Sequence, residues 1–173
     1  MIDCTLKRIV FFLSFCVLSI SAFSQEEAEK EGEFSHHCLN EERSLTIGLA
    51  GIYSNELESI GIHGRMYYNI GESICFGPEY SFIKTEEIEI VDFDFVGHYI
   101  FETPWVGIYP LVGVNYSVEE ELEHDETIAE VGLVFGAGIH RNFKNFTGFI
   151  EYSRVEYGIE DQFITFGLMY NFK

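Results

Sequence analysis

The sequence predicts an all-β fold: an eight-stranded antiparallel up-and-down β-barrel that crosses a membrane, formed by residues 44–173. Three observations lead to this fold class. Large apolar side chains recur at every second position, the pattern divides into eight runs, and the alternate positions carry glycine and charged residues. Because successive side chains of a β-strand point to opposite faces, each run has one apolar face and one polar face.

Residues 1–24 are predicted to be a secretory signal peptide. Two basic residues precede an apolar segment at 9–20, and the small residues Ala22 and Ser24 stand where a signal peptidase expects them. This apolar segment is shorter than the roughly 20 residues that a membrane-spanning helix needs. We therefore expect it to be removed after export.

Residues 25–43 are polar, charged and without apolar periodicity, which predicts a flexible acidic leader on the periplasmic side. The whole chain has 29 Asp and Glu residues against 10 Lys and Arg residues. This acidity argues against nucleic acid as a partner, because phosphates require basic surfaces. No later segment is long and apolar enough for a spanning helix, so a membrane would have to be crossed by strands.

The eight runs supply strands of the length that a tilted transmembrane strand needs, about 9–11 residues or slightly more. The connections after the second, fourth and sixth runs are short and are expected to be periplasmic turns. The remaining connections are then expected to face outside. In order, the runs cover residues 44–53, 58–69, 72–83, 87–101, 105–118, 127–141, 146–156 and 162–172.

The polar faces of the runs carry charges at mid-strand, and these charges decide which face of each strand points into the barrel. The lumen of an eight-stranded barrel is only just wide enough for side chains to fill. It cannot hold the large apolar faces of all eight runs, so these are expected to face lipid while glycine and charged pairs fill the interior. The predicted lumen charge network consists of Arg65, Glu79, Asp92, Asp94, Glu130 and Glu151.

Arg65 is the one basic residue that this assignment places at mid-lumen, with Glu79, Glu130 and Glu151 as candidate partners. Buried charges need pairing. We therefore expect a packed salt-bridge network that closes the lumen. The excess of carboxylates leaves a narrow cation-preferring pore as the alternative.

The last run ends in a motif with the order polar, any, Gly, any, any, aromatic or apolar, any, aromatic. Thr165, Gly167, Tyr170 and Phe172 occupy its defined positions. With this motif and the eight alternating runs, the chain resembles the small OmpA/OmpX-like outer-membrane β-barrel proteins of Gram-negative-type bacteria. The resemblance implies that the barrel-assembly machinery reads these four residues as a signal. It also implies a monomer in the cell outer membrane, in contact with lipid and lipopolysaccharide.

The function expected from these features is a structural or narrow-pore role in the broad porin-like class, with no enzymatic activity and no cofactor. The nearest arrangement to a catalytic triad is His140 with Glu151 and Ser153 on the neighbouring run. A different class remains open. A secreted soluble lipocalin-like barrel would point its apolar side chains inward around an apolar ligand.

Three further features have modest interpretations. Cys38 and Cys75 remain after the signal is removed, and a disulfide between them is one hypothesis for an oxidising compartment. The acidic segment 119–126 is expected to be a solvated outer loop, with divalent-cation binding as the alternative. His36 and His37 precede Cys38, but no spaced partner pair completes a tetrahedral set, so no metal site is expected.

Overall fold

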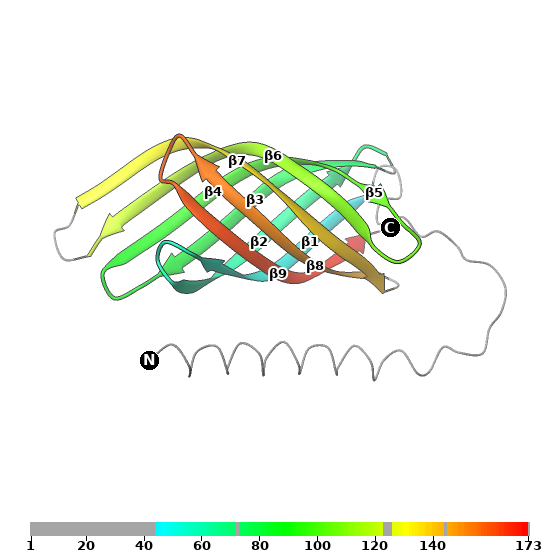
Figure 1. The fold of residues 1–173 in the computed structure, drawn as a ribbon, viewed down its shortest axis with the longest axis horizontal. Helices are drawn as coiled ribbons and strands as arrows, with labels where there is room; N and C mark the ends of the chain where they lie inside the picture. The colour runs from blue at the N-terminus through cyan, green and yellow to red at the C-terminus, as the bar shows by residue number, and fades with distance from the viewer. Residues whose placement is uncertain (1–43, 72, 123–125, 144, 173) are drawn as a thin grey trace. The chain divides into compact units, whose positions relative to one another are not determined.

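In the computed structural model, residues 44–71, 73–122, 126–143 and 145–172 are described, and most of them lie in β-strands (Figure 1). The signal peptide and leader predicted for residues 1–43 lie outside them. Within the described ranges no helix is long and apolar enough to span a membrane. The strands are β1 Leu45–Ser54, β2 Ser59–Asn69, β3 Ile74–Lys84, β4 Ile88–Tyr99, β5 Phe101–Glu102, β6 Gly107–Glu121, β7 Glu126–Phe143, β8 Phe146–Glu156 and β9 Asp161–Phe172.

The strands form one closed antiparallel barrel. Each long strand pairs with the next, β1 also pairs with the last strand β9, and β4 pairs with β6. β5 has only two residues and pairs with the start of β6, so eight long strands make the wall. Closure matters in lipid, because backbone groups at an open sheet edge would find no hydrogen-bond partner there. The predicted eight-stranded up-and-down antiparallel barrel is confirmed.

The β6–β7 hairpin is longer than predicted. β6 continues to Glu121, and β7 already begins at Glu126. The cross-strand register runs on from Val118 opposite Ala129 to Glu121 opposite Glu126, so the ladder extends into the segment expected to be a loop. Residues 119–121 and 126 of the acidic segment are therefore strand.

The fourth predicted run is interrupted. β4 ends before Ile100, β5 follows, and β6 begins two residues later than expected. The later start of β6 follows from a tight turn around Pro104, which has no N–H to give to a ladder. In this turn the Thr103 N–H donates to the Val106 carbonyl over 3.0 Å, and the Val106 N–H donates to Thr103 Oγ1 over 3.2 Å.

The outer face of the barrel is an apolar belt. On β2, Ile60, Ile62 and Met66 are exposed while His63 and Arg65 are buried, as the alternation predicts. Ten tilted strand residues rise about 25 Å, which is about the height of the apolar band of membrane barrels. Other exposed members of the belt are Leu49, Tyr80, Phe93, Phe95, Val112, Val114, Leu133, Phe135, Ile150, Ile164, Phe166 and Leu168.

The inner face is less polar than the sequence predicts. Charged side chains lie there, but so does a cluster of buried apolar ones that includes Ile52, Ile83, Val96, Val155 and Phe163. The expectation that glycine and charged pairs fill the lumen was therefore incomplete. A lumen of this width is filled to the density of a protein interior, and charged groups occupy only the places where they find partners.

Candidate functional site

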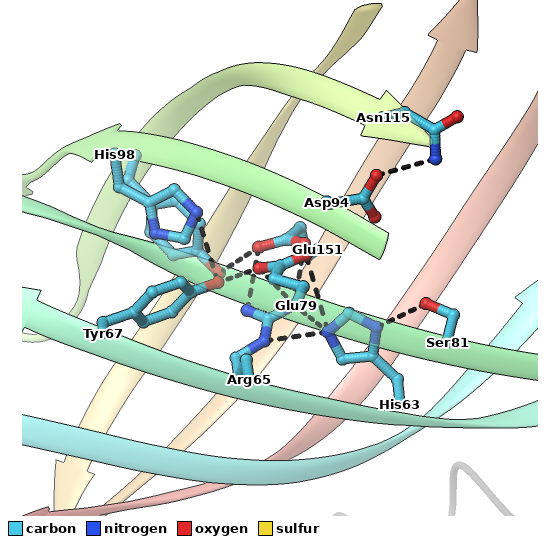
Figure 2. A network of polar contacts seen from close by, with 10 residues as sticks. His63, Arg65, Tyr67, Glu79, Ser81, Asp94, His98, Asn115 and Glu151 are labelled. Carbon is cyan, nitrogen blue, oxygen red and sulfur yellow. Dashed lines mark hydrogen bonds and ion pairs between the residues drawn. The ribbon is translucent and has the colours of Figure 1, made fainter. Parts of the chain in front are cut away.

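An ion pair crosses the lumen between Arg65 on β2 and Glu151 on β8 (Figure 2). Arg65 Nη1 donates to Glu151 Oε2 over 3.1 Å, and Arg65 Nη2 donates to Glu151 Oε1 over 2.9 Å. Both side chains are buried. Two parallel hydrogen bonds between a guanidinium and a carboxylate give a strong and directional contact, so this pair ties opposite parts of the wall together.

Arg65 has a second carboxylate partner, Glu79 on the adjacent strand β3. Arg65 Nη2 lies 3.5 Å from Glu79 Oε1. The Tyr67 hydroxyl donates a hydrogen bond to the same Glu79 oxygen. Figure 2 shows Glu79 and Glu151 lying beside one guanidinium. One positive charge therefore serves two buried carboxyl groups.

His63 completes the surroundings of Arg65. Arg65 Nε donates to His63 Nε2 over 3.1 Å, and His63 Nδ1 lies 2.9 Å from Ser81 Oγ. A guanidinium has only donors, so His63 Nε2 must accept. The proton of a neutral imidazole is then on Nδ1, which donates to the Ser81 hydroxyl. The arrangement holds His63 as a neutral acceptor for arginine.

Aromatic rings enclose the ion pair. The Arg65 guanidinium carbon lies 4.1 Å from the centre of the Phe149 ring, a distance at which a cation is attracted to the ring face. The Tyr109 hydroxyl donates to Glu151 Oε2 over 2.9 Å. Glu151 therefore accepts from a neutral donor as well as from arginine.

A stack of three rings lies beside this group. The rings of His98 and Tyr109 are 4.8 Å apart, and those of Tyr109 and His140 are 5.6 Å apart. Glycines make room for them. A Cβ on Gly138 would lie 2.4 Å from the Tyr109 ring, and one on Gly107 would lie 2.1 Å from the His140 ring. At these two positions a side chain would displace the stack.

A small cavity lies beside Arg65 and the ring stack. Its volume is about 20 Å³, and its walls include Arg65, Tyr67, His98, Tyr109 and Met169. A cavity of roughly 10–15 Å³ by this measure holds one water molecule. The lumen is therefore filled by side chains here, with space for about one water molecule.

Asp92 and Asp94 on β4 form a separate polar group with residues of β6. Asn115 Nδ2 donates to Asp94 Oδ1 over 2.7 Å, and the Ser117 hydroxyl donates to Asp92 Oδ1. These neutral donors satisfy carboxylate oxygens without a positive charge. The two aspartates also adjoin the first group, since Glu79 faces Asp94 across the β3–β4 pair.

The structure thus brings together five of the six residues predicted for the lumen network. Arg65, Glu79 and Glu151 are in ionic contact, and Asp92 and Asp94 lie next to them. Glu130 is exposed. It lies on the inward-facing side of β7, opposite Ser117, but on the part of the hairpin that extends beyond β8. The side chain of Glu130 therefore points inward as predicted, but it does not lie at mid-lumen.

Several neutral partners were missed by reasoning from charges alone. Tyr67, Tyr109, Asn115 and Ser117 supply most of the hydrogen bonds to the buried carboxylates. The signal that finds them is the same alternation. Tyr67 has the same phase as Arg65 on β2, and Asn115 has the same phase as Ser117 and Tyr109 on β6.

Within the described residues, the other candidate sites from the sequence do not come together as a catalytic or metal-binding group. Cys75 is buried, and Cys38 lies outside the described residues, so their pairing stays a prediction. Glu151 is held by Arg65 and Tyr109. His140 instead approaches Glu102, with 3.4 Å between Nε2 and Oε1. No group of three His, Cys, Asp or Glu side chains that could hold a metal ion occurs within the described ranges.

The four residues of the C-terminal motif lie on β9, which closes the barrel against β1. Thr165 is buried, and Phe172 is exposed on the outer belt. Gly167 packs tightly against β1, because a Cβ there would lie 2.4 Å from the Leu49 carbonyl oxygen. Tyr170 contacts Phe146 and Phe172 edge-on. The motif therefore faces both lumen and outer surface.

Comparisons with known proteins bear on the fold. No protein-family model matches the sequence, and no curated protein sequence matches it. Among solved structures, the N-terminal β-barrel domain of Pseudomonas aeruginosa OprF is similar, with a TM-score of 0.66 and 17% identity, covering 76% of this chain and 98% of that one.

Two further structures have the same architecture. Neisserial surface protein A (NspA) has a TM-score of 0.55 and 15% identity, covering 75% of this chain and 96% of that one. Ail, the attachment invasion locus protein of Yersinia pestis, has a TM-score of 0.52 and 16% identity, covering 75% and 97%. The chain has the fold of these small eight-stranded outer-membrane barrels.

Proposed function

We propose that this protein is an outer-membrane β-barrel with a structural role and a lumen closed by its own side chains. The observation that carries the proposal is the reversed polarity of the barrel. Large apolar side chains cover the outside, while Arg65, Glu79 and Glu151 are buried inside. Leaving such a belt in water would be costly, whereas lipid accommodates it at no cost in hydration.

The closed state of the lumen is supported by its packing. The ion pair of Arg65 with Glu151 spans the interior, and the cavity beside it has space for about one water molecule. A conducting pore needs a continuous aqueous path. The narrow cation-preferring pore stays the second candidate, because the buried carboxylates of this group outnumber its single guanidinium.

A soluble lipocalin-like carrier fits less well. Such a barrel holds its ligand in the interior, and pockets for small ligands usually measure roughly 300–1,000 Å³. The cavity beside Arg65 is about 20 Å³. In addition, the belt residues Leu49, Ile60 and Val112 would be in water, and each is at least 66% exposed.

Membrane fractionation followed by a detergent gel of boiled and unboiled samples tests the proposal. We expect the protein in the outer-membrane fraction, with unboiled protein migrating differently from boiled protein because the closed barrel resists detergent. A soluble protein whose mobility does not depend on heating would rule out the membrane assignment and favour the carrier.

Biogenesis belongs to the same proposal. Residues 1–24 would direct export, and β9 with Thr165, Gly167, Tyr170 and Phe172 would be recognised by the barrel-assembly machinery. The folded protein would be a monomer in contact with lipid and lipopolysaccharide. The position of β9 as the closing strand supports this role, because its pairing with β1 completes the barrel.

A further inference from the structure

The basic residues of the barrel differ in whether a carboxylate lies beside them. Three of the four in the described ranges have such a partner, namely Arg65 with Glu151, Lys84 with Glu89 and Arg154 with Glu156. Arg141 on β7 is the fourth, and no carboxylate of the described residues is in ion-pair contact with it. Its guanidinium carbon lies 5.7 Å from the centre of the Phe143 ring. Within the described part of the chain, Arg141 is therefore an exposed positive charge without a counter-charge.

Arg141 points outward at one end of the apolar belt. His140 before it is buried, and Ile139 is exposed on the belt, so the alternation of β7 puts Arg141 on the outer face. β7 ends two residues later at Phe143, and β8 begins at Phe146. In the proposed orientation this short turn faces the periplasm. Arg141 then lies where the belt meets the lipid headgroups of the periplasmic leaflet.

The outer surface beside Arg141 has an open position flanked by apolar side chains. Arg141 is opposite Gly148 on β8, and Gly148 is opposite Leu168 on β9. A Cβ on Gly148 would lie 3.6 Å from the Phe143 ring and 3.7 Å from Leu168, so it would only be in ordinary contact with them. An acyl chain can therefore lie over Gly148 while its headgroup reaches the guanidinium.

The exposed acids of the described residues gather at the opposite end of the barrel. They lie in or near the connections β1–β2, β3–β4, β6–β7 and β8–β9, and include Glu58, Glu87, Glu126 and Glu160. At the end that carries Arg141, the one described acid is Glu102, which approaches His140. An anionic headgroup is therefore repelled least at the end where the unpaired guanidinium lies.

The chemistry of a guanidinium favours a phosphate as its partner. Its planar fork binds two phosphate oxygens at once, and the arginine stem can extend along apolar surface to the headgroup level. The phosphate of a zwitterionic lipid is neutralised by the cationic group of its own headgroup. An anionic phospholipid has no such group, so its phosphate charge is available to Arg141.

We propose that Arg141, with the open surface at Gly148, binds an anionic phospholipid of the periplasmic leaflet. The headgroup phosphate lies against the guanidinium, and an acyl chain lies between Phe143 and Leu168. This inference rests on the proposed membrane location and adds to it a lipid class and a residue. The experiment below therefore reports on membrane insertion separately from the choice of headgroup.

The chain supplies its own reporter for the test. Trp105 is its only tryptophan and is 78% exposed. It lies two residues before Gly107, which pairs with His140 next to Arg141. The refolded chain is placed in vesicles that mix brominated phosphatidylglycerol with ordinary phosphatidylcholine, or the reverse, and quenching of Trp105 gives the relative binding of the two lipids. We expect phosphatidylglycerol to be preferred about fivefold, the contribution of one base near an anionic surface.

Matched variants connect this preference to Arg141. Arg141→Gln should lower the ratio about fivefold, whereas Arg141→Lys should keep part of it because the charge remains. Arg154→Gln is the control, since Arg154 has the outward phase near the other end of β8 and is paired with Glu156. It should leave the ratio at Trp105 unchanged. Heat-dependent gel mobility shows whether each protein has inserted and folded.

The possible failures have different meanings. Insertion of the native chain without a headgroup preference would overturn the inference and leave the membrane assignment standing. An unchanged ratio in Arg141→Gln, or an equal decrease in Arg154→Gln, would also overturn it, because the preference would then not come from Arg141. Failure to insert into either kind of vesicle would overturn the membrane assignment and the inference together.

Discussion

Arg65 depends on partners from three strands, and they depend on it. It bonds to Glu151 on β8, approaches Glu79 on β3 and donates to His63 on its own strand β2. Buried charges are tolerated when they are paired and hydrogen-bonded, and removing one partner leaves the other charges uncompensated. Arg65 therefore stabilises the whole group of buried charges in the lumen.

Replacing Arg65 with alanine should destabilise the barrel by about 3–5 kcal/mol, because Glu79 and Glu151 would be left buried without a cation. Urea unfolding of the refolded protein in lipid vesicles measures the loss. The matched control is Arg154→Ala, since Arg154 pairs with Glu156 at 3.3 Å on the surface and is 42% exposed. Exposed pairs contribute about 0–1 kcal/mol. Similar small losses in both variants would contradict a central role for Arg65.

A second residue-scale prediction concerns the ring stack. Gly138→Ala places a Cβ 2.4 Å from Tyr109, which is held between two histidine rings, so the stack must shift. We expect a loss of about 1–3 kcal/mol, the usual cost of overpacking, measured by the same unfolding method. Gly97→Ala is the control, because its nearest neighbour, the Val112 carbonyl oxygen, is 3.9 Å away. Unchanged stability of Gly138→Ala would show that the lumen is loosely packed there.

At the scale of elements, β9 combines three tasks. It closes the barrel with β1, it contributes Ile164, Phe166 and Leu168 to the outer belt, and it carries the C-terminal motif. Its alternation is the same as in the other strands, so packing alone does not distinguish the motif positions from their neighbours. Substitutions on the same face of β9 can make that distinction.

Replacing Tyr170 and Phe172 with alanine should reduce the amount of assembled barrel in the outer membrane and increase periplasmic or degraded protein. The reason is that these aromatic residues occupy the defined positions of the assembly motif. Phe166→Ala is the control, since Phe166 lies on the same outer face of β9 at a position the motif leaves open. Immunoblots of fractionated cells report the outcome. Equal assembly of all three proteins would remove the motif from the proposal.

At the scale of the whole molecule, the barrel separates two environments by reversing the usual polarity. Its outer belt consists of exposed aromatic and aliphatic side chains, and its lumen combines an apolar cluster with paired charges. Closure of the chain pairs the strand edges and encloses the charged groups, while the apolar belt stays on the outside. Closure of the wall and blockage of the lumen are separate properties, and each needs its own measurement.

Purified protein in planar lipid bilayers should show no stepwise conductance, because side chains fill the lumen around Arg65 and leave space for about one water molecule. Detergent alone is the negative control, and a general porin in the same bilayer is the positive control. Reproducible cation-selective steps from the folded protein would favour the narrow pore over the closed barrel.

Much of the fold followed from alternation, because a strand with one apolar side must repeat with a period of two. β8 begins and ends where the sequence predicts. The differences occur where a local effect overrides the period. Pro104 ends a ladder, and the β6–β7 pairing continues through glutamates that read as loop residues. Neither effect changes which face a side chain takes.

The sequence could predict which residues belong to the candidate site, but it could not predict which of them contact each other. Arg65, Glu79 and Glu151 have the inward phase, which the sequence shows. The sequence does not show how far each strand is shifted against the next around a closed barrel, and that shift sets the depth of a residue. Glu130 and Glu151 have the same inward orientation, yet one is exposed and the other meets Arg65.

The sequence by itself determined the number of long strands, the orientation of each side chain and the acidity of the chain, because these depend on local period and composition. Only the tertiary structure decided which inward residues meet. Arg65 and Glu151 are 86 residues apart, and they touch because closure of the barrel across β1 and β9 brings β2 and β8 to facing sides of one narrow lumen. Residues 126–131 of β7 pair with β6 but not with β8, whose ladder with β7 begins only at Leu133.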